Sequence, residues 1–287
     1  MGFNSEGLGL PKGTDELLRS LIHERTGIYF DNGKAELLTD KLSPLVIERG
    51  FSSFLDYYYL LKYDEAAQGE WLSVFDALSV PETFFWREMD QVRALVETIV
   101  PRWVGERGAE PLKIWSAACA TGEEPLTIAM ALEEAGWFER ARIEIQASDG
   151  SPAVVERARR GLYRGRAFRN LPAPLRERYF TREGDGPTAR WRVSPELHAR
   201  VGWGVANLMD EGEVAARAAA HVIFCRNVFI YFSESAVARV ARSFAKFIRP
   251  PGYLFVGTSE SLLRLTTDFS LEEMGDAFVY VKRGSAG

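Results

Sequence analysis

The sequence predicts a small all-α domain followed by an α/β domain. Over residues 11–79, apolar side chains recur at the spacing of amphipathic helices. Over residues 91–285, short apolar runs alternate with helical patterns, which is typical of an α/β fold. Residues 112–136 show the order of strand, turn and helix most clearly, and the α/β domain is interpreted around them.

The all-α domain is expected to contain four helices, because local start and stop signals divide it. They are placed from Thr14, over Lys34–Arg49, from Ser52 or Ser53, and over Trp71–Leu78. Pro44 lies inside the second of these helices, where a proline is expected to bend it.

The central stretch begins with an alternating apolar strand, Leu112–Ser116. Small residues and then Gly122 follow, and small side chains allow a backbone to approach a bound molecule closely. Pro125 suits the first turn of a helix, and Gly136 is a natural helix end. This order of elements builds a cofactor site at the end of the first strand of many α/β domains.

The turn does not have the pattern of a phosphate-binding loop. It has one glycine where a dinucleotide site requires three, and no Gly-Lys-Ser/Thr string. Glu123 and Glu124 stand at the helix start, where carboxylates would repel a pyrophosphate. They would suit a ligand with an ammonium or sulfonium group or with hydroxyls. Alternatively, they only complement the positive end of the helix dipole.

An acidic residue follows the second expected strand, which covers Ala141–Ser148. Asp149 stands where α/β proteins hold the hydroxyls of a ribose. It could also cap the next helix, since Ser151-Pro-Ala follows, and the two roles are compatible.

The segment 80–90 is expected to be a linker that contributes to the site. Three aromatic residues stand together between Thr83 and Arg87. They form either a hydrophobic hinge between the domains or a lid that places Arg87 in a cleft, because domain junctions commonly bind ligands.

The remaining segments complete the α/β domain. A helix over Asp90–Ile99 and a surface loop over Pro101–Pro111 precede the first strand. An antiparallel insertion is expected at about 178–204, where a Gly-Asp-Gly-Pro turn is flanked by 191–193 and 201–203. It could grip a partner or cover a sheet edge. Later elements are a strand over Val222–Cys225, a helix over Ala236–Ile248, and strands over Tyr253–Gly257 and Ala277–Lys282.

Composition restricts the class of protein. The 287 residues carry a formal net charge of −5, with 46% hydrophobic and 26% charged residues, as in soluble globular proteins. No apolar run approaches the ~20 residues of a membrane span, and the N-terminus lacks a signal-peptide pattern. The two cysteines and three histidines show no ligand spacing. We therefore expect a cytoplasmic protein with no metal site, no membrane insertion and no nucleic-acid partner.

Several strings occur in an order that resembles one family. They are Thr83-Phe-Phe-Trp-Arg-Glu, Trp115-Ser-Ala-Ala-Cys-Ala-Thr-Gly-Glu-Glu-Pro, Ala147-Ser-Asp, Asn207-Leu and Ile223-Phe-Cys-Arg-Asn-Val-Phe-Ile-Tyr-Phe. Together they resemble the CheR-type protein-glutamate O-methyltransferases, the chemotaxis receptor methyltransferase family. The resemblance covers nearly the whole chain. It implies a Rossmann-like methyltransferase domain over 91–285 with an antiparallel β insertion, after the all-α domain.

The resemblance implies that the cofactor is S-adenosylmethionine. The cofactor-binding residues that it indicates are Pro81, Thr83, Arg87, Glu124, Asp149, Asn207, Leu208, Arg226 and Asn227. Asp149 would hold the ribose hydroxyls, Asn207 and Leu208 would border the adenine, and Arg226 and Asn227 would close the site. Arg87 and Tyr231 would be catalytic, facing the methyl group. A sulfonium cofactor carries no phosphate, which agrees with the missing glycines.

The implied reaction is attack of a glutamate carboxylate on the sulfonium methyl group, giving a glutamate methyl ester. A free glutamate has a pKa of ~4.3, so no general base is required. The implied partners are cytoplasmic helices of chemoreceptors or another signalling protein, and a monomer is expected. Alternatives are a non-catalytic S-adenosylmethionine-binding scaffold and a small-molecule methyltransferase; the helical domain and the insertion argue against the second.

Among the features that differ from the pattern of the family, two concern the binding of the cofactor and of the substrate. Pro81 stands where the family usually has an asparagine, which removes one polar contact to the cofactor. The family's second helix is typically basic and is thought to recognise acidic receptor helices. Here it reads Lys41-Leu-Ser-Pro-Leu-Val-Ile-Glu-Arg, with few positive charges, so the mode of substrate recognition is open.

Overall fold

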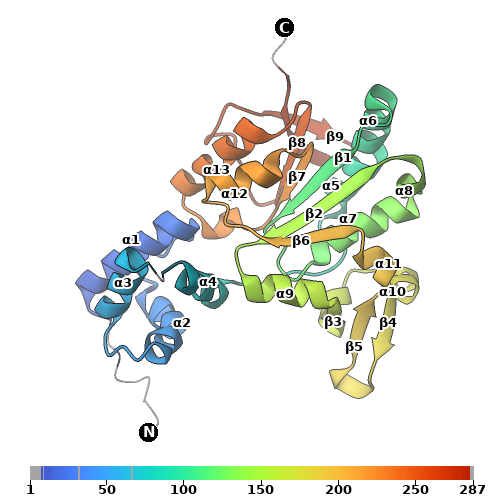
Figure 1. Ribbon diagram of the computed structural model, residues 1–287. Helices are drawn as coiled ribbons and strands as arrows, with labels where there is room; N and C mark the ends of the chain where they lie inside the picture. The colour runs from blue at the N-terminus through green and yellow to red at the C-terminus, as the bar shows by residue number, and fades with distance from the viewer. Residues whose placement is uncertain (1–7, 9, 32, 66, 285–287) are drawn as a thin grey trace.

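The computed structural model describes residues 8, 10–31, 33–65 and 67–284. A helical domain and an α/β domain lie beside each other, and a small antiparallel sheet projects from the second (Figure 1). The helical domain consists of α1 Lys12–Thr26, α2 Ala35–Glu48, α3 Phe54–Tyr63 and α4 Ala67–Leu78. Its apolar faces form a core of their own, which includes Leu18, Leu38, Phe54 and Trp71.

The helical domain follows the predicted pattern, and the clearest difference is the start of its fourth helix. Helix α4 begins at Ala67, so the prediction that it starts at Trp71 was wrong. Helix α2 contains Pro44 and continues beyond it to Glu48. Of the two serines expected to cap α3, it is Ser53 whose hydroxyl accepts a hydrogen bond from the N–H of Asp56.

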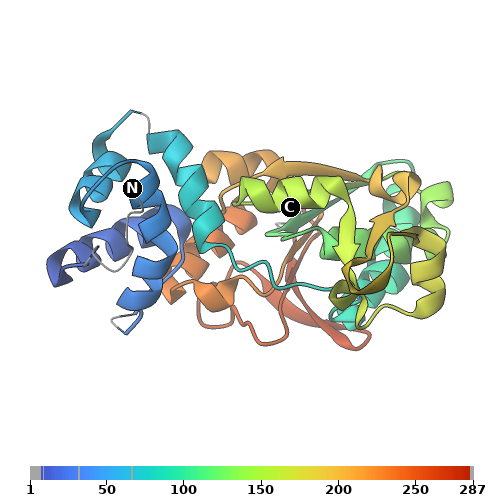
Figure 2. The ribbon, with the colours of Figure 1, turned by 90° about the horizontal axis from the view of Figure 1, so that it is seen from below.

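The chain then crosses to the α/β domain as an extended linker (Figure 2). It continues as α5 Met89–Ala94, a π-helical segment Leu95–Ile99 and α6 Val100–Arg107. The predicted surface loop from Pro101 was therefore wrong. Pro101 lies in the first turn of α6, directly after the π-helical segment, where its missing N–H breaks no regular helical bond. The indole of Trp103 donates to the carbonyl of Glu110 and anchors the helix end.

The main sheet has seven strands in the order β6-β2-β1-β7-β8-β10-β9. The first five in this order are parallel, and β10 is antiparallel to both β8 and β9. The strands are β1 Leu112–Ala117, β2 Ile143–Asp149, β6 Val201–Val205, β7 Val222–Cys225, β8 Gly252–Val256, β9 Ser270–Met274 and β10 Ala277–Lys282.

Helices cover both faces of this sheet. They are α7 Glu123–Glu134, α8 Trp137–Arg140, α9 Pro152–Arg160, α12 Glu211–Ala218 and α13 Glu234–Phe247. Side chains alternate along β1, because successive residues of a strand point to opposite faces. Ile114 belongs to the core that contains α7, whereas Trp115 belongs to the core that contains α12 and α13. Strand β1 thus lies between the two cores, and the residues that follow its C-terminal end line a cavity at the domain junction.

The small sheet is antiparallel, as expected, but it is built from other segments. Its strands are β3 Leu162–Arg164, β5 Arg190–Val193 and β4 Phe180–Glu183, in that order, with α10 Ala173–Tyr179 and α11 Pro195–His198 beside them. The prediction that residues 201–203 belong to the insertion was wrong, because β6 pairs with β2 in the main sheet. Phe85 of the linker is fully buried among rings of the small sheet and its neighbours. The centre of its ring lies 4.8 Å from that of Tyr163 and 5.0 Å from that of Phe180.

Candidate active site

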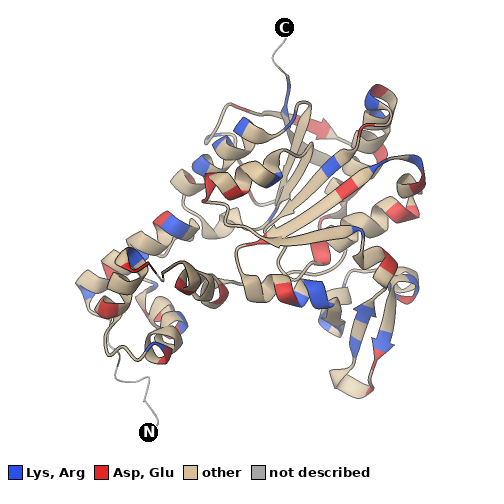
Figure 3. Cartoon of the chain, in the orientation of Figure 1, with Lys and Arg blue, Asp and Glu red and all other residues tan. Residues whose placement is uncertain are grey.

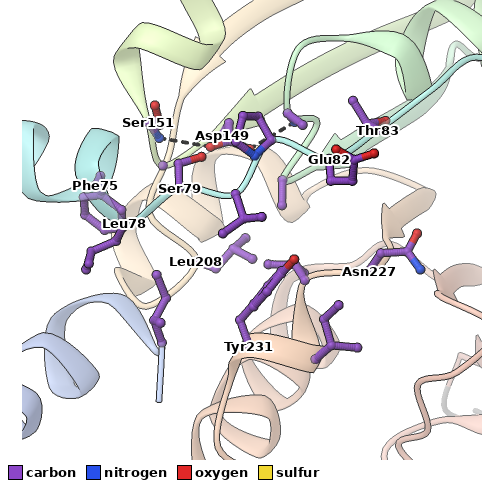
Figure 4. Close-up of a pocket in the computed structure, with 18 of the residues that line it drawn as sticks. Phe75, Leu78, Ser79, Glu82, Thr83, Asp149, Ser151, Leu208, Asn227 and Tyr231 are labelled. Carbon is purple, nitrogen blue, oxygen red and sulfur yellow. Dashed lines mark hydrogen bonds between the residues drawn. The ribbon is translucent and has the colours of Figure 1, made fainter. Parts of the chain in front are cut away.

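One cavity of about 320 Å³ lies where the C-terminal ends of β1, β2 and β7 meet the linker and the helical domain. All ten residues that the family resemblance indicated line it: Pro81, Thr83, Arg87, Glu124, Asp149, Asn207, Leu208, Arg226, Asn227 and Tyr231. Figure 4 shows Asp149 on one wall and Tyr231 rising from the opposite side. Segments up to about 150 residues apart in the chain are therefore brought to a single space.

The turn after β1 forms one wall of the cavity. Ala118 and Ala120 adopt positive φ angles of 60° and 48°, and the N–H of Ala120 donates to Asp149 Oδ2 at 3.0 Å. Gly122, with φ of 95°, faces the protein instead: a Cβ there would lie 2.8 Å from the ring of Trp203. The glycine is therefore required by packing, while the alanines leave room at the cavity.

Asp149 supports the start of α9 without being its N-cap, so the expectation that it caps this helix was wrong, and its contact with ribose hydroxyls stays a prediction. Its Oδ1 accepts the N–H of Ser151 at 3.0 Å, so it holds the chain that enters α9. The N-cap itself is Ser151, whose hydroxyl accepts from Val154. Burial raises the pKa of Asp149, while the N–H groups of Ser151 and Ala120 oppose that shift. Each carboxylate oxygen accepts one backbone bond, which leaves a further lone pair on each.

The two glutamates at the start of α7 have different surroundings. Glu123 is buried away from the cavity, accepts the hydroxyl of Thr121 at 2.6 Å, and has its pKa raised by burial. Glu124 lines the cavity, but its oxygens are already paired: Oε1 accepts the hydroxyl of Ser116 and Oε2 accepts Nε of Arg226, each at 2.6 Å. The sequence offered two roles for these glutamates, contact with a ligand or compensation of the helix dipole. Only Glu124 lies where it could contact a ligand.

Arg226 joins the main sheet to the linker. Its side chain is 2% exposed and forms an ion pair with Glu124. Its guanidinium also donates to the backbone carbonyls of Arg87 and Glu88, both at 3.2 Å, and to Oε1 of Gln91 at 3.1 Å. Because four of its five N–H donors are used by protein groups, Arg226 acts through the position of its neighbours.

Two carboxylates that the sequence did not indicate, Glu88 and Glu260, extend the contacts of Arg226 between the main sheet and the linker. We call Arg226, Glu88 and Glu260 the clamp. Glu88 accepts the amide of Asn227 at 3.1 Å and the N–H of Thr258 at 3.3 Å. Glu260 accepts the N–H groups of Asn227, Gly257 and Ile230, and burial raises its pKa. Glu88 stands inside the aromatic motif of the linker, which was the available signal; Glu260 lies outside every motif.

Strained backbone is confined to this site. Non-glycine residues with positive φ in the described chain are Trp86, Glu88, Ala118, Ala120 and Asn227. All belong to the linker, the turn after β1 or the end of β7. Such conformations cost about 1–3 kcal/mol each and persist where the surroundings fix them. Arg87 thus sits between two strained residues: Trp86 donates its N–H to the hydroxyl of Thr127, and the carbonyl of Glu88 accepts from Arg226.

Arg87 and Tyr231 approach the cavity from different elements. The Nη1 of Arg87 donates to the carbonyl of Glu82 at 3.3 Å, and its Nε lies 3.8 Å from Glu88 Oε1. Tyr231 ends the 3₁₀ turn Phe229–Tyr231, is 37% exposed, and points toward the linker (Figure 4). Its carbonyl accepts the N–H of Tyr29 at 2.8 Å, so the helical domain helps to fix it.

The helical domain supplies a wall of the cavity, which the sequence did not indicate. Phe75 and Leu78 of α4 line it, together with residues between α1 and α2. The domains are joined by direct bonds: the amide of Asn207 donates to the carbonyl of Arg25 at 2.8 Å, and Asp76 accepts the hydroxyl of Ser151 at 2.5 Å. Leu208 is buried beside these contacts.

Comparison with known proteins identifies the family. Residues 15–79 match the all-alpha domain of CheR methyltransferases, and residues 81–278 match their S-adenosylmethionine-binding domain. The chain belongs to the CheR methyltransferase family. It is 33% identical to chemotaxis protein methyltransferase 2 of Vibrio cholerae over 92% of this chain and 91% of the relative. It is 32% identical to the chemotaxis protein methyltransferase of Escherichia coli over 93% and 91%, and 35% identical to that of Klebsiella aerogenes over 88% and 85%.

This CheR chain is therefore an S-adenosylmethionine-dependent methyltransferase, of the class whose members methylate glutamate carboxylates of proteins. The predicted family, cofactor and α/β methyltransferase fold with a preceding all-α domain are confirmed. Within the described residues, no helix is both long and apolar enough to cross a membrane.

The cavity suits this cofactor. Asp149 retains lone pairs for two hydroxyls, and Leu208 provides an apolar surface for a base. The turn after β1 offers alanines in place of a phosphate cradle, which agrees with a cofactor that carries no phosphate. The volume lies at the small end of the range of ligand sites.

Proposed function

We propose that this enzyme methylates glutamate side chains of chemoreceptors and forms glutamate methyl esters. Membership of the CheR family over both domains supports this proposal. The observation that carries it is that Asp149, Arg87 and Tyr231 line a single cavity, so that cofactor-holding and carboxylate-orienting groups lie together. The proposed partners are cytoplasmic helices of chemoreceptors, met by a monomeric enzyme in the cytoplasm.

The walls of the cavity have separate roles in this proposal. When bound, S-adenosylmethionine supplies a methyl group on a positively charged sulfur, which a carboxylate can attack directly. Asp149 holds the ribose hydroxyls, and Asn207 and Leu208 border the adenine. Pro81, Thr83 and Glu124 line the remaining surface. Arg226 and Asn227 act mainly by positioning the linker, because most of their polar atoms are bonded to protein.

The target glutamate needs orientation more than activation. Its pKa of ~4.3 leaves it ionised at neutral pH, so no base has to remove a proton. Within the described chain, the guanidinium of Arg87 makes one hydrogen bond, which leaves several N–H donors for a carboxylate. The hydroxyl of Tyr231 can donate to the same carboxylate. Alignment of this kind can supply roughly 7–11 kcal/mol of the barrier reduction.

The test is transfer of tritiated methyl groups from S-adenosylmethionine to the membrane fraction of the host. Mild alkali then releases methyl esters as volatile methanol. We expect alkali-labile label on receptor-sized bands, which is lost with Asp149→Ala. Alkali-stable label would show that the acceptor is not a carboxylate. Binding of the cofactor without transfer to any fraction would favour the non-catalytic scaffold.

A further inference from the structure

An apolar rim surrounds the mouth of the cavity. Exposed large apolar side chains gather there: Tyr29 is 52% exposed, Leu37 45%, Val80 50% and Ile230 55%, and all four line the cavity. Isolated exposed apolar residues are common, but several around one opening mark a binding surface. We call these four residues the apolar rim.

The apolar rim is assembled from three parts of the fold. Tyr29 and Leu37 come from the helical domain, Val80 begins the linker, and Ile230 belongs to the 3₁₀ turn that also carries Tyr231. Tyr29 is tied to Tyr231 by a backbone hydrogen bond of 2.8 Å. Tyr29 and Ile230 therefore have fixed positions relative to Tyr231, next to the place where a substrate carboxylate would approach it.

Positive and negative residues are present in similar number where α2 borders the opening of the cavity. Lys34 is paired with Asp31 at 3.4 Å, and the ammonium of Lys41 donates to the carbonyl of Ala77 at 3.0 Å. Between these lysines α2 exposes Glu36 and Asp40. Figure 3 shows that acidic and basic residues alternate along the ribbon of the helical domain. This face offers no concentrated positive field to an acidic partner.

We propose that the apolar rim docks a helical segment of the substrate protein in which apolar side chains stand one turn from the target glutamate. The inference rests on the proposed function and adds the mode of recognition. Residues three or four apart share one face of a helix. When the carboxylate enters the cavity toward Tyr231, its neighbours one turn away meet Leu37 and Ile230. The enzyme thus selects its substrate by apolar contact, and charge contributes little.

The experiment measures initial rates of methyl transfer against the concentration of host membranes. Leu37→Ser and Ile230→Ser are compared with Leu17→Ser, a leucine of similar exposure (43%) that lies outside the cavity lining. We expect each rim variant to raise the half-saturating membrane concentration about five- to tenfold, because apolar contact area is lost. Leu17→Ser should leave it within twofold. The dissociation constant of S-adenosylhomocysteine should not change in any of the three.

Salt separates the two modes of recognition. Apolar docking predicts that the half-saturating concentration changes less than about twofold between 50 and 300 mM salt, because screening acts on charges. Rim variants that behave like Leu17→Ser, or a strong rise with salt together with a large effect of Lys34→Gln, would overturn the inference. If the wild-type enzyme transferred no methyl group to membranes, the proposed function would be wrong, and this outcome is distinct from failure of the rim alone.

Discussion

At the scale of single residues, Arg226 lines the cavity and is bonded mainly to groups of the protein itself. It is nearly buried and bonds Glu124, the linker carbonyls and Gln91. The sequence placed it at the end of a buried strand and thus at the ligand side of the sheet. The sequence did not reveal its partners, because they are distant in the chain and depend on a strained linker.

Replacing Arg226 tests this clamp. Arg226→Met leaves the half-buried carboxylate of Glu124 with one partner, so the free energy of unfolding should fall by up to about 3–5 kcal/mol. Arg283→Met is the matched control, because Arg283 pairs with Glu272 at 2.7 Å but is 76% exposed. Such a surface pair is worth about 0–1 kcal/mol. Urea unfolding of the two variants measures both values, and equal losses would contradict the clamp.

Replacing Arg87 is predicted to lower the rate of methyl transfer more than it weakens binding of the cofactor. Arg87→Ala should lower the rate of methyl transfer about 100-fold, because the substrate carboxylate loses its orienting donor. The dissociation constant of S-adenosylhomocysteine, measured by calorimetry, should rise much less. Full turnover in this variant would remove Arg87 from the proposed mechanism, and an equal loss in both quantities would make it a cofactor ligand only.

His221 should make stability depend on pH. Burial, together with Arg249, Lys113 and Arg107, lowers the pKa of His221 to about 4, from the ordinary 6.5. The unfolded chain therefore takes up the proton first as pH falls. The contribution of His221 to the free energy of unfolding should be fully present above pH ~6.5 and should fall by about 3 kcal/mol between pH 6.5 and 4.

The pH dependence is isolated by a variant that cannot titrate. Raised pKa values of Asp149, Glu123 and Glu260 act in the opposite direction, so the total slope mixes several groups. The difference between wild type and His221→Gln in urea unfolding, followed from pH 4 to 7.5, reports His221 alone. A constant difference over this range would show that its pKa is not lowered.

At the scale of elements, the segment after α1 acts as a strap between the domains. Ile28 forms a β-bridge with Phe232, and Tyr29 bonds the carbonyl of Tyr231. Gly27, with φ of 77°, packs so closely that a Cβ would lie 2.5 Å from the ring of Phe232. This contact aligns the strap with the turn that carries Tyr231.

Two glycines separate the effect of this contact from backbone strain. Gly27→Ala and Gly50→Ala introduce the same strain, since φ is 77° and 76°, but a Cβ at Gly50 meets nothing within 4 Å. Gly50→Ala should cost about 1–2 kcal/mol. Gly27→Ala should cost about 1–3 kcal/mol more and should also lower the transfer rate. Thermal unfolding and the transfer assay test this, and equal effects of the two variants would contradict the role of the strap.

The elements show where local patterns are sufficient. The strand, turn and helix after Leu112 were predicted because alternation, small residues and Pro125 agree. Residues 201–203 were assigned to the wrong sheet, because an alternating pattern does not indicate the strand with which it pairs. Helix α6 was missed because Pro101–Pro111, a segment rich in glycine and charge, was interpreted as a surface loop, although a proline fits a first turn.

At the scale of the whole molecule, the cavity exists because two domains meet. Motifs in the linker and the α/β domain were sufficient to predict ten residues that line this cavity. The wall formed by Phe75, Leu78 and the strap was not predictable, because it depends on how the helical domain docks. Bonds such as those of Asn207 and Asp76 fix that docking, and no local pattern indicates them.

The most direct test of the central claim is identification of the methylated atom. Host membranes are incubated with S-adenosylmethionine and the enzyme, and receptor peptides are analysed by mass spectrometry. We predict methyl esters on glutamates of chemoreceptor cytoplasmic helices with the wild-type enzyme and none with Asp149→Ala. Methyl groups found only on other residue types, or on small molecules and not on receptors, would contradict the account.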